Sequence, residues 1–196
     1  MPIVGEQEKL RRNKMFKLEP CDVLLYVNEG KDIFSAISRW GAGRYSHVAM
    51  YIGKAFDDVP FLFESSGRGT TLINLQSHTG RLVKVMRADH LASWQKKEII
   101  AKAIELASDP QAYYDYHAIA WYCIPRVLKR KFPFLPIPPK YVRDKKVICS
   151  EAVAEAFWRA GIQVLPKDVV PLPGDFESSP ILEVVGEGRL LEDILP

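Results

Sequence analysis

The segment SHVAMYIG, residues 46–53, is rich in β-favouring residues, and FLFE, residues 61–64, follows it after a turn around residues 57–60. Short apolar runs that are bounded by turn residues are typical of paired strands. Similar runs occur at residues 22–28, 71–75, 82–87 and 181–191. Their close spacing along the chain predicts a mostly antiparallel sheet.

Two longer segments have the periodicity of helices. Residues 93–108 form the clearer one, with a predicted buried face of Ile99, Ile100, Ala103, Ile104 and Ala107. Residues 148–160 form the second, with a predicted stripe of Val153, Ala156, Phe157 and Ala160. A short helix is also expected at residues 32–40. This order of elements predicts an α+β domain whose sheet packs against the helix that bears Cys149.

The bulk composition is that of an ordinary globular domain. The chain has 196 residues, of which 47% are hydrophobic and 26% charged, and a net charge of +3. This length suffices for a substantial core in a single domain. The charge is too small to predict nucleic-acid binding. Since neither a secretory signal nor an apolar run of the ~20 residues needed to span a bilayer is seen, a cytoplasmic location is the default expectation. Action at the cell envelope would then need another route.

The chain divides into an arm and a domain. Residues 1–17 are polar and basic, and we expect a loose arm or a surface helix there. Residues 18–196 form the predicted catalytic domain. Within it, residues 121–148 hold five prolines, several aromatics and a basic cluster. This composition indicates a long surface loop, which is either solvated, a lid over a substrate, or in contact with a lipid surface through residues 121–146.

Cysteine usage points to a nucleophile. The chain has three cysteines, Cys21, Cys123 and Cys149, with irregular spacing and no CxxC pair. An odd count of this kind predicts free thiols in a reducing compartment, and neither a metal site nor a cofactor is expected. Cys149 opens a predicted helix, where unpaired N–H groups and the helix dipole favour a thiolate. Cys21 and Cys123 are expected to be structural.

A cysteine nucleophile needs a base and a group that orients the base. Of the four histidines, His47 begins a predicted strand and is the preferred base, with His117 as its rival. His78 lies in a polar turn and is expected to be solvated, whereas His90 precedes a helix that it is expected to cap. Glu64 ends the next strand and reaches His47 if the two strands pair, so that its carboxylate would orient the imidazole.

Together these segments resemble a known family. YSHVAMYIG (45–53), FLFESSGRGT (61–70) and ICSEAVAEAF (148–157) are similar to the circularly permuted branch of the NlpC-type papain-like hydrolases, the YiiX-like proteins. In that branch the histidine strand precedes the cysteine helix, as it does here. LEPCDVLLY (18–26) resembles the first strand of the branch, with Cys21 where a glycine is usual. PLPGDFESSPILEVVG (171–186) resembles its closing segment.

The resemblance implies a permuted papain-like fold and assigns roles to four residues. Cys149 would be the nucleophile, His47 the base and Glu64 its partner. Tyr114 would support the oxyanion, with Tyr113 and Tyr116 as alternatives. The implied activity is that of a cysteine peptidase or amidase that acts through an acyl-enzyme on bacterial cell-wall peptides. The alternatives are a lipid or thioester acyl hydrolase or acyltransferase and a catalytically silent binding module.

Overall fold

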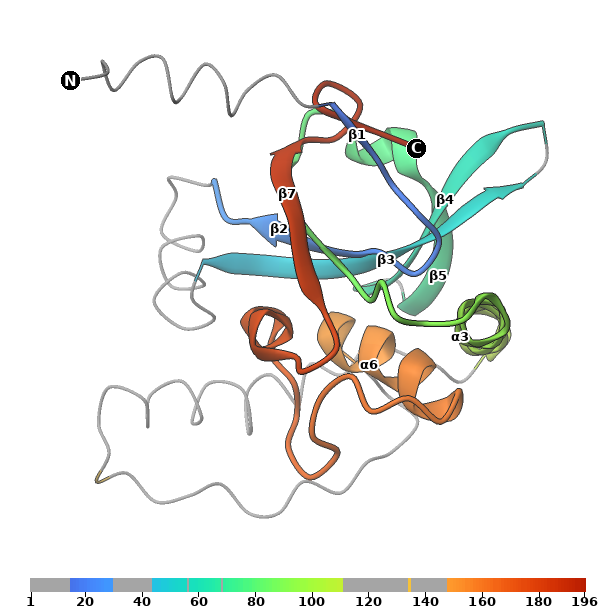
Figure 1. Cartoon of the computed structure of the whole chain (residues 1–196), viewed down its shortest axis with the longest axis vertical. Helices are drawn as coiled ribbons and strands as arrows, with labels where there is room; N and C mark the ends of the chain where they lie inside the picture. Colours follow the sequence, from blue (N-terminus) through green and yellow to red (C-terminus); the bar gives the residue numbers. More distant parts are fainter. Residues whose placement is uncertain (1–14, 30–43, 56, 68, 111–133, 135–147) are drawn as a thin grey trace.

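The computed structural model describes residues 15–29, 44–55, 57–67, 69–110, 134 and 148–196. Within them, six antiparallel strands form one sheet in the order β5-β4-β3-β2-β6-β7 (Figure 1). The strands are β2 (Val23–Val27), β3 (Tyr45–Ala55), β4 (Val59–Ser66), β5 (Gly69–Asn74), β6 (Leu82–Arg87) and β7 (Glu183–Arg189). The predicted antiparallel sheet and α+β class are therefore confirmed, whereas the predicted helix at residues 32–40 lies outside the described residues.

A second, smaller sheet joins the two ends of the described chain. β1 (Phe16–Lys17) pairs in parallel with β8 (Ile194–Leu195). The prediction of a loose arm or a surface helix at residues 1–17 is therefore wrong for Phe16 and Lys17. The pairing could not be seen locally, because the two strands are two residues long and lie at opposite ends of the sequence.

Helices cover one face of the main sheet (Figure 1). α6 (Cys149–Arg159) and α3 (Ser93–Ser108) share a core cluster with alternate residues of β2, among them Val23 and Leu25. The intervening residues, Leu24 and Tyr26, belong to a second cluster on the other face, together with residues of η1 (Leu75–His78), β1 and β8. Alternation along β2 therefore divides its side chains between two apolar layers, as a strand buried on both faces requires.

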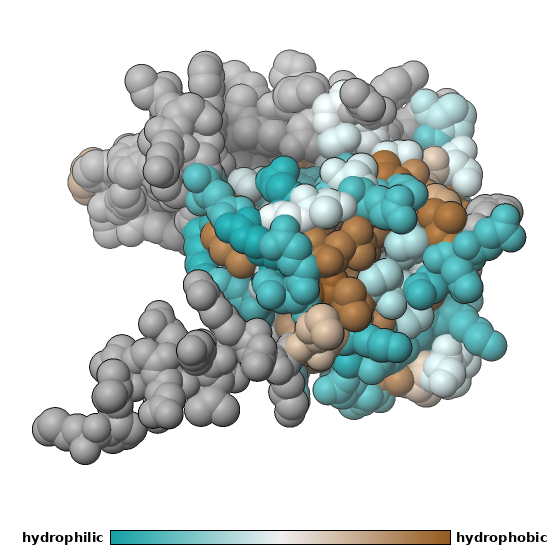
Figure 2. All heavy atoms as spheres, turned by 90° about the horizontal axis from the view of Figure 1, so that it is seen from above, coloured by the Kyte–Doolittle hydropathy of each residue, from teal (hydrophilic) through white to brown (hydrophobic). Residues whose placement is uncertain are grey.

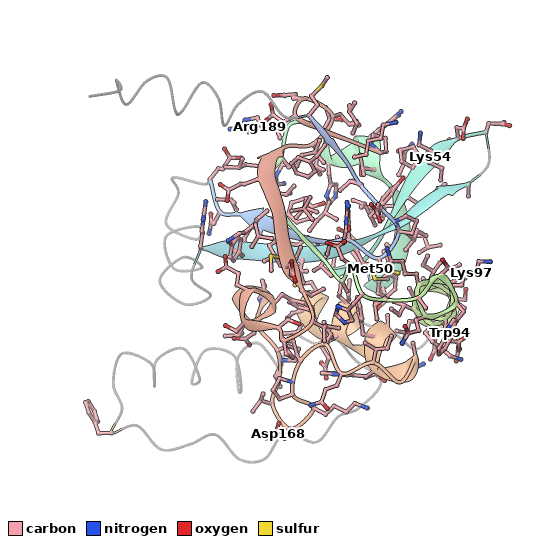
Figure 3. The ribbon with its side chains drawn as sticks, in the orientation of Figure 1. Met50, Lys54, Trp94, Lys97, Asp168 and Arg189 are labelled. Carbon is pink, nitrogen blue, oxygen red and sulfur yellow. The ribbon has the colours of Figure 1, made fainter. Side chains whose placement is uncertain are left out.

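The two helices differ in how deeply they are buried. All but two residues of α6, Glu155 and Arg159, are buried, including Ser150 and Glu151 at its start, so it is a central helix rather than one with a single apolar stripe. α3 buries Ile99, Ala103 and Leu106, whereas Ile104, which was expected inside, is exposed. In Figure 3, Met50 lies in the core between the sheet and these helices, while Trp94 and Lys97 lie on the outside of α3.

Most of the visible surface is polar. In the view of Figure 2, charged and polar side chains surround a narrow apolar strip. The exposed large apolar side chains of the described residues are scattered, and Trp94 of α3 is 68% exposed. In the described part of the chain, no helix combines the length and apolar character needed to cross a membrane.

A buried carboxylate anchors β2 to β6. Asp22 is completely buried, and its two oxygens accept hydrogen bonds from Nε and Nη2 of Arg87 at 2.7 and 2.8 Å. Glu19 donates its backbone N–H to the same carboxylate. The preceding residue, Cys21, has a φ of 76°, in the left-handed region that favours glycine. A glycine at this position would adopt the same backbone conformation without steric cost.

Removing the Arg87 guanidinium should leave the buried Asp22 carboxylate without its cationic partner. We expect Arg87→Ala to lower the free energy of unfolding by about 3–5 kcal/mol, the usual loss when a buried ion pair is broken from one side. Arg159→Ala is the matched control, because the Arg159–Glu155 pair lies on the surface of α6 and should contribute about 0.5 kcal/mol. Denaturant unfolding measures both changes. Losses of equal size would contradict the anchoring role of Asp22.

Candidate active site

Neighbouring strands bring His47 and Glu64 together. β3 and β4 pair antiparallel, with Met50 opposite Phe63, and this register carries Glu64 back toward His47. The His47 Nε2 lies 2.8 Å from a Glu64 carboxylate oxygen, Oε2. The two side chains are 22% and 8% exposed, so water screens the interaction only weakly. The predicted proximity of this histidine and this carboxylate is confirmed.

A bulge lies directly beside His47. His47 is opposite Tyr26 in the pairing of β2 with β3, but the next pair joins Val27 to Tyr45. Ser46 is therefore the extra residue. Bulges bend a strand and redirect the neighbouring side chains, and they are common beside active sites. This one lies immediately before His47, between it and Tyr45.

The Cys149 thiol lies at the start of α6, where the sequence predicts it. A hydrogen bond joins it to the His47 imidazole, and the backbone N–H groups of Val48 and Ser150 also point at the sulfur. Burial alone would raise the pKa of Cys149. The charge of His47, its hydrogen bond and the two N–H groups outweigh burial, so that the pKa lies below its ordinary value.

The imidazole is affected in the opposite direction. Burial alone would lower the pKa of His47, but the Cys149 thiolate and the Glu64 carboxylate both favour the imidazolium, and the pKa is raised. Because Nε2 is directed at Glu64, Nδ1 is the nitrogen available to the thiol. A thiolate on one side of the ring and a carboxylate on the other therefore stabilise a buried imidazolium.

His78 is part of this site, and the prediction that it is solvated is wrong. Its side chain is 17% exposed, and its Nε2 lies 3.7 Å from Glu64 Oε2, the oxygen that His47 contacts. Its Nδ1 lies 2.6 Å from the Tyr26 hydroxyl. The other polar residues of its turn bond locally: Asn74 caps Gln76, and Thr79 donates to the Gln76 carbonyl. The turn is thus closed without His78, whose ring is free to face inward.

Two other predictions about histidines have different outcomes. His90 is exposed and does not cap α3, because the N-cap is Ala92, whose N–H donates to the side chain of Gln95. His117 lies outside the described residues, as do Tyr113, Tyr114, Tyr116, Cys123 and the loop at 121–148 apart from Phe134 and Ile148. The oxyanion and membrane assignments therefore remain predictions.

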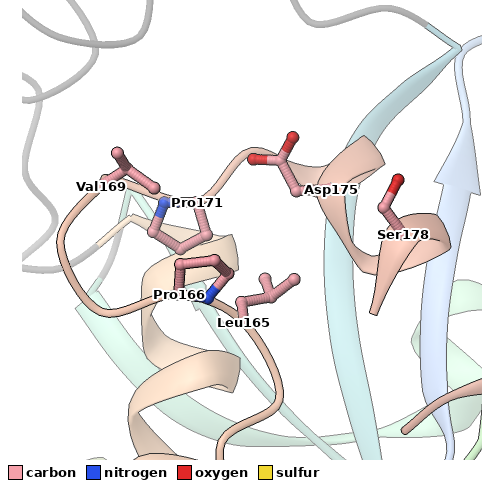
Figure 4. A pocket seen from close by; sticks show the side chains of 6 residues that line it. All are labelled: Leu165, Pro166, Val169, Pro171, Asp175 and Ser178. Atoms are coloured by element: carbon pink, nitrogen blue, oxygen red, sulfur yellow. The ribbon is translucent and has the colours of Figure 1, made fainter. Parts of the chain in front are cut away.

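The segment after α6 is tied to the start of that helix. Ser150, which follows the candidate nucleophile, donates a buried 2.7 Å hydrogen bond to the Pro171 carbonyl. Pro171 also lines a pocket of about 210 Å³ between this segment and η3 (Pro173–Ser178), shown in Figure 4. The Asp175 carboxylate in the pocket wall accepts the Leu172 N–H, so it holds the turn of the chain into η3.

A metal centre is not indicated in the described residues. Within them, no group of three or more His, Cys, Asp or Glu side chains is arranged to hold a metal ion. No family model matches the chain, and no curated protein matches it.

The two described cysteines should differ sharply in reactivity. Cys21 is buried, and its thiol donates a hydrogen bond to the Lys96 carbonyl. Burial raises the pKa of Cys21 to about 12, so this thiol stays protonated at pH 7. The pKa of Cys149 is instead lowered by His47 and two backbone N–H groups despite burial, which favours its thiolate. We expect iodoacetamide to label Cys149 faster than Cys21 or Cys123 in the folded protein at pH 7, measured by peptide mapping after brief exposure. Equal or slower labelling of Cys149 would contradict an activated thiolate.

Proposed function

We propose that the chain is a cysteine hydrolase of the permuted papain-like type, in which Cys149, His47 and Glu64 form a catalytic triad. The observation that carries this proposal is the continuous chain of contacts from the thiol through the imidazole to a nearly buried carboxylate. Nucleophile, base and orienting group are the three parts that covalent acyl transfer requires. The order of histidine strand and cysteine helix along the sequence agrees with the permuted branch that the chain resembles.

The first half of the reaction forms an acyl-enzyme. The Cys149 thiolate attacks the carbonyl carbon of the substrate, and the carbon–oxygen double bond opens to an oxyanion. The backbone N–H of Cys149, in the first turn of α6, is available to donate to that oxygen. When the oxyanion collapses, the carbon–nitrogen bond breaks, and the His47 imidazolium gives its proton to the departing amine. A thioester on Cys149 and a neutral His47 remain.

The second half returns the enzyme to its starting state. Neutral His47 takes a proton from water as the water oxygen attacks the thioester carbon. Collapse of the second oxyanion breaks the carbon–sulfur bond and releases a carboxylic acid. Cys149 leaves as a thiolate and His47 is again an imidazolium. Glu64 stays ionised throughout, and its role is to hold the ring and stabilise its positive charge. Burial would raise the pKa of Glu64, but the hydrogen bond and charge of His47 lower it, in agreement with that role.

The substrate we propose is a peptide amide of the bacterial cell wall. The resemblance to NlpC-type hydrolases supports this choice, and Tyr114 is the side chain that it suggests as a further oxyanion donor. A lipid or thioester acyl group would undergo the same steps, with an alcohol or thiol as the leaving group. The two substrate classes therefore have to be separated by experiment.

Substrate profiling separates them directly. We expect the wild-type protein to cleave purified cell-wall fragments, with mass spectrometry detecting a new amine and a new carboxyl end, and to leave anionic phospholipid vesicles intact. Cys149→Ala should abolish cleavage, because it removes the attacking atom. Fatty-acid release from vesicles by the wild type alone would instead favour the lipid acyl activity. Equal cleavage by Cys149→Ala would contradict the proposed nucleophile.

Glu64 should matter less than Cys149 but measurably. Glu64→Gln keeps the shape of the side chain and removes its charge, so we expect kcat to fall on the order of 10²- to 10⁴-fold with the fold retained. Glu183→Gln, on an exposed position of β7, is the matched control and should not change kcat. Turnover of the wild-type substrate by each variant provides the comparison. Full activity of Glu64→Gln would assign the orienting role to another residue.

A further inference from the structure

A layer of side chains lies behind the proposed triad. The Tyr26 ring is fully buried and contacts both histidines, with its centroid 5.3 Å from that of His47 and 5.1 Å from that of His78. Both histidines direct Nε2 at the same oxygen of Glu64, His47 at 2.8 Å and His78 at 3.7 Å. The Arg81 guanidinium lies over the Tyr26 ring, 5.6 Å from its centroid.

The hydrogen bond between Tyr26 and His78 has one favourable direction. If Nδ1 of a neutral His78 donated its proton to Tyr26, the lone pair on Nε2 would face the Glu64 carboxylate, which is repulsive. If the Tyr26 hydroxyl donates to Nδ1, the proton of His78 sits on Nε2 and faces the carboxylate. Burial, followed by the charge of Glu64, raises the pKa of Tyr26, so the phenol keeps the proton that it donates.

His78 is held in its neutral form by its surroundings. Burial lowers its pKa, and the charges of His47 and Arg81 lower it further, while Glu64 opposes them; the net direction is downward. A second imidazolium beside Glu64 would compete with His47 for the same oxygen. A neutral ring contributes only the dipole of its N–H, which is directed at Glu64. This dipole holds the carboxylate in place and does not displace His47.

We propose that His78 and Tyr26 are positioning residues of the proposed triad: Tyr26 fixes the tautomer of His78, and His78 fixes the Glu64 carboxylate against His47. This inference rests on the proposed function, because it assigns the two residues an effect on the Cys149–His47 ion pair. Its observable consequence is the acidity of the Cys149 thiol. If the Glu64 carboxylate is not held in place, it stabilises the His47 imidazolium less. A less stable imidazolium in turn stabilises the Cys149 thiolate less, so the pKa of Cys149 rises.

The experiment measures the rate of Cys149 alkylation by iodoacetamide as a function of pH, with peptide mapping to isolate this cysteine. In the wild type we expect a midpoint well below that of an ordinary thiol. His78→Phe keeps a ring of similar size but loses both nitrogens. It should slow alkylation near pH 6 by about threefold to tenfold, the size expected for losing one ordinary hydrogen bond. The limiting rate at high pH should be unchanged, because the sulfur remains equally accessible.

Three further variants test the direction of the effect. Tyr26→Phe removes only the hydroxyl and should give a smaller shift of the same sign. The double variant, Tyr26→Phe with His78→Phe, should shift the alkylation curve no further than His78→Phe alone, since Tyr26 acts through His78. His78→Gln should retain much of the wild-type behaviour, because an amide can accept from Tyr26 and donate to Glu64. His90→Phe, at an exposed histidine, is the control and should leave the curve unchanged.

The outcomes separate the positioning role from the triad itself. A low wild-type midpoint that neither His78→Phe nor Tyr26→Phe changes would overturn the positioning role and leave the proposed function standing. A wild-type midpoint equal to that of an ordinary thiol would overturn both. Thermal unfolding of each variant shows whether it is folded, and the conservative Tyr26→Phe keeps the test decisive if His78→Phe does not fold.

Discussion

The hydrogen-bonded chain from Cys149 through His47 to Glu64 constrains the rest of this structure. An ionised thiol, an imidazolium and a carboxylate that lie largely out of water are each costly alone and tolerable only as partners. They must therefore be held within hydrogen-bond distance of one another. The fold meets this requirement by placing the first turn of α6 against β3, and by pairing β3 with β4 so that His47 and Glu64 become neighbours.

Much of the molecule serves to keep α6 in that place. The helix is buried along most of its length, and buried hydrogen bonds tie it to the chain that follows: Ser150 donates to Pro171, and Trp158 donates to Leu165. On the strand side, a bulge at Ser46 immediately precedes His47, which keeps the regular register of β3. The Asp22–Arg87 ion pair holds β2 and β6 together on the opposite side of β2 from β3. Rigid support of this kind would hold the proposed triad in catalytic geometry.

The sequence predicted the parts that depend on local periodicity and failed where a long-range contact decides. Apolar runs bounded by turn residues located β2 to β6 within a few residues, and the pairing of two adjacent strands was enough to bring His47 to Glu64. The inward position of His78 depends on Tyr26, which lies 52 residues earlier in the chain and cannot be paired with it from a local pattern. The burial of Leu106 in place of Ile104 depends on which face of α3 meets the sheet and α6. Asn74 and Thr79 are the one local signal for His78, because a turn that satisfies its own polar groups leaves its remaining side chain available.

The proposed mechanism depends on Cys149 and His47 forming a thiolate–imidazolium pair at neutral pH. The ultraviolet absorbance of the thiolate reports this state without a substrate or an alkylating reagent. The measurement is a pH titration of the folded wild-type protein minus the same titration of Cys149→Ala, which cancels Cys21 and Cys123. We expect the difference absorbance to be fully developed already at pH 7 and to be lost only at acid pH. A difference absorbance that first appears at or above about pH 8.5, the pKa of a free cysteine, would contradict it.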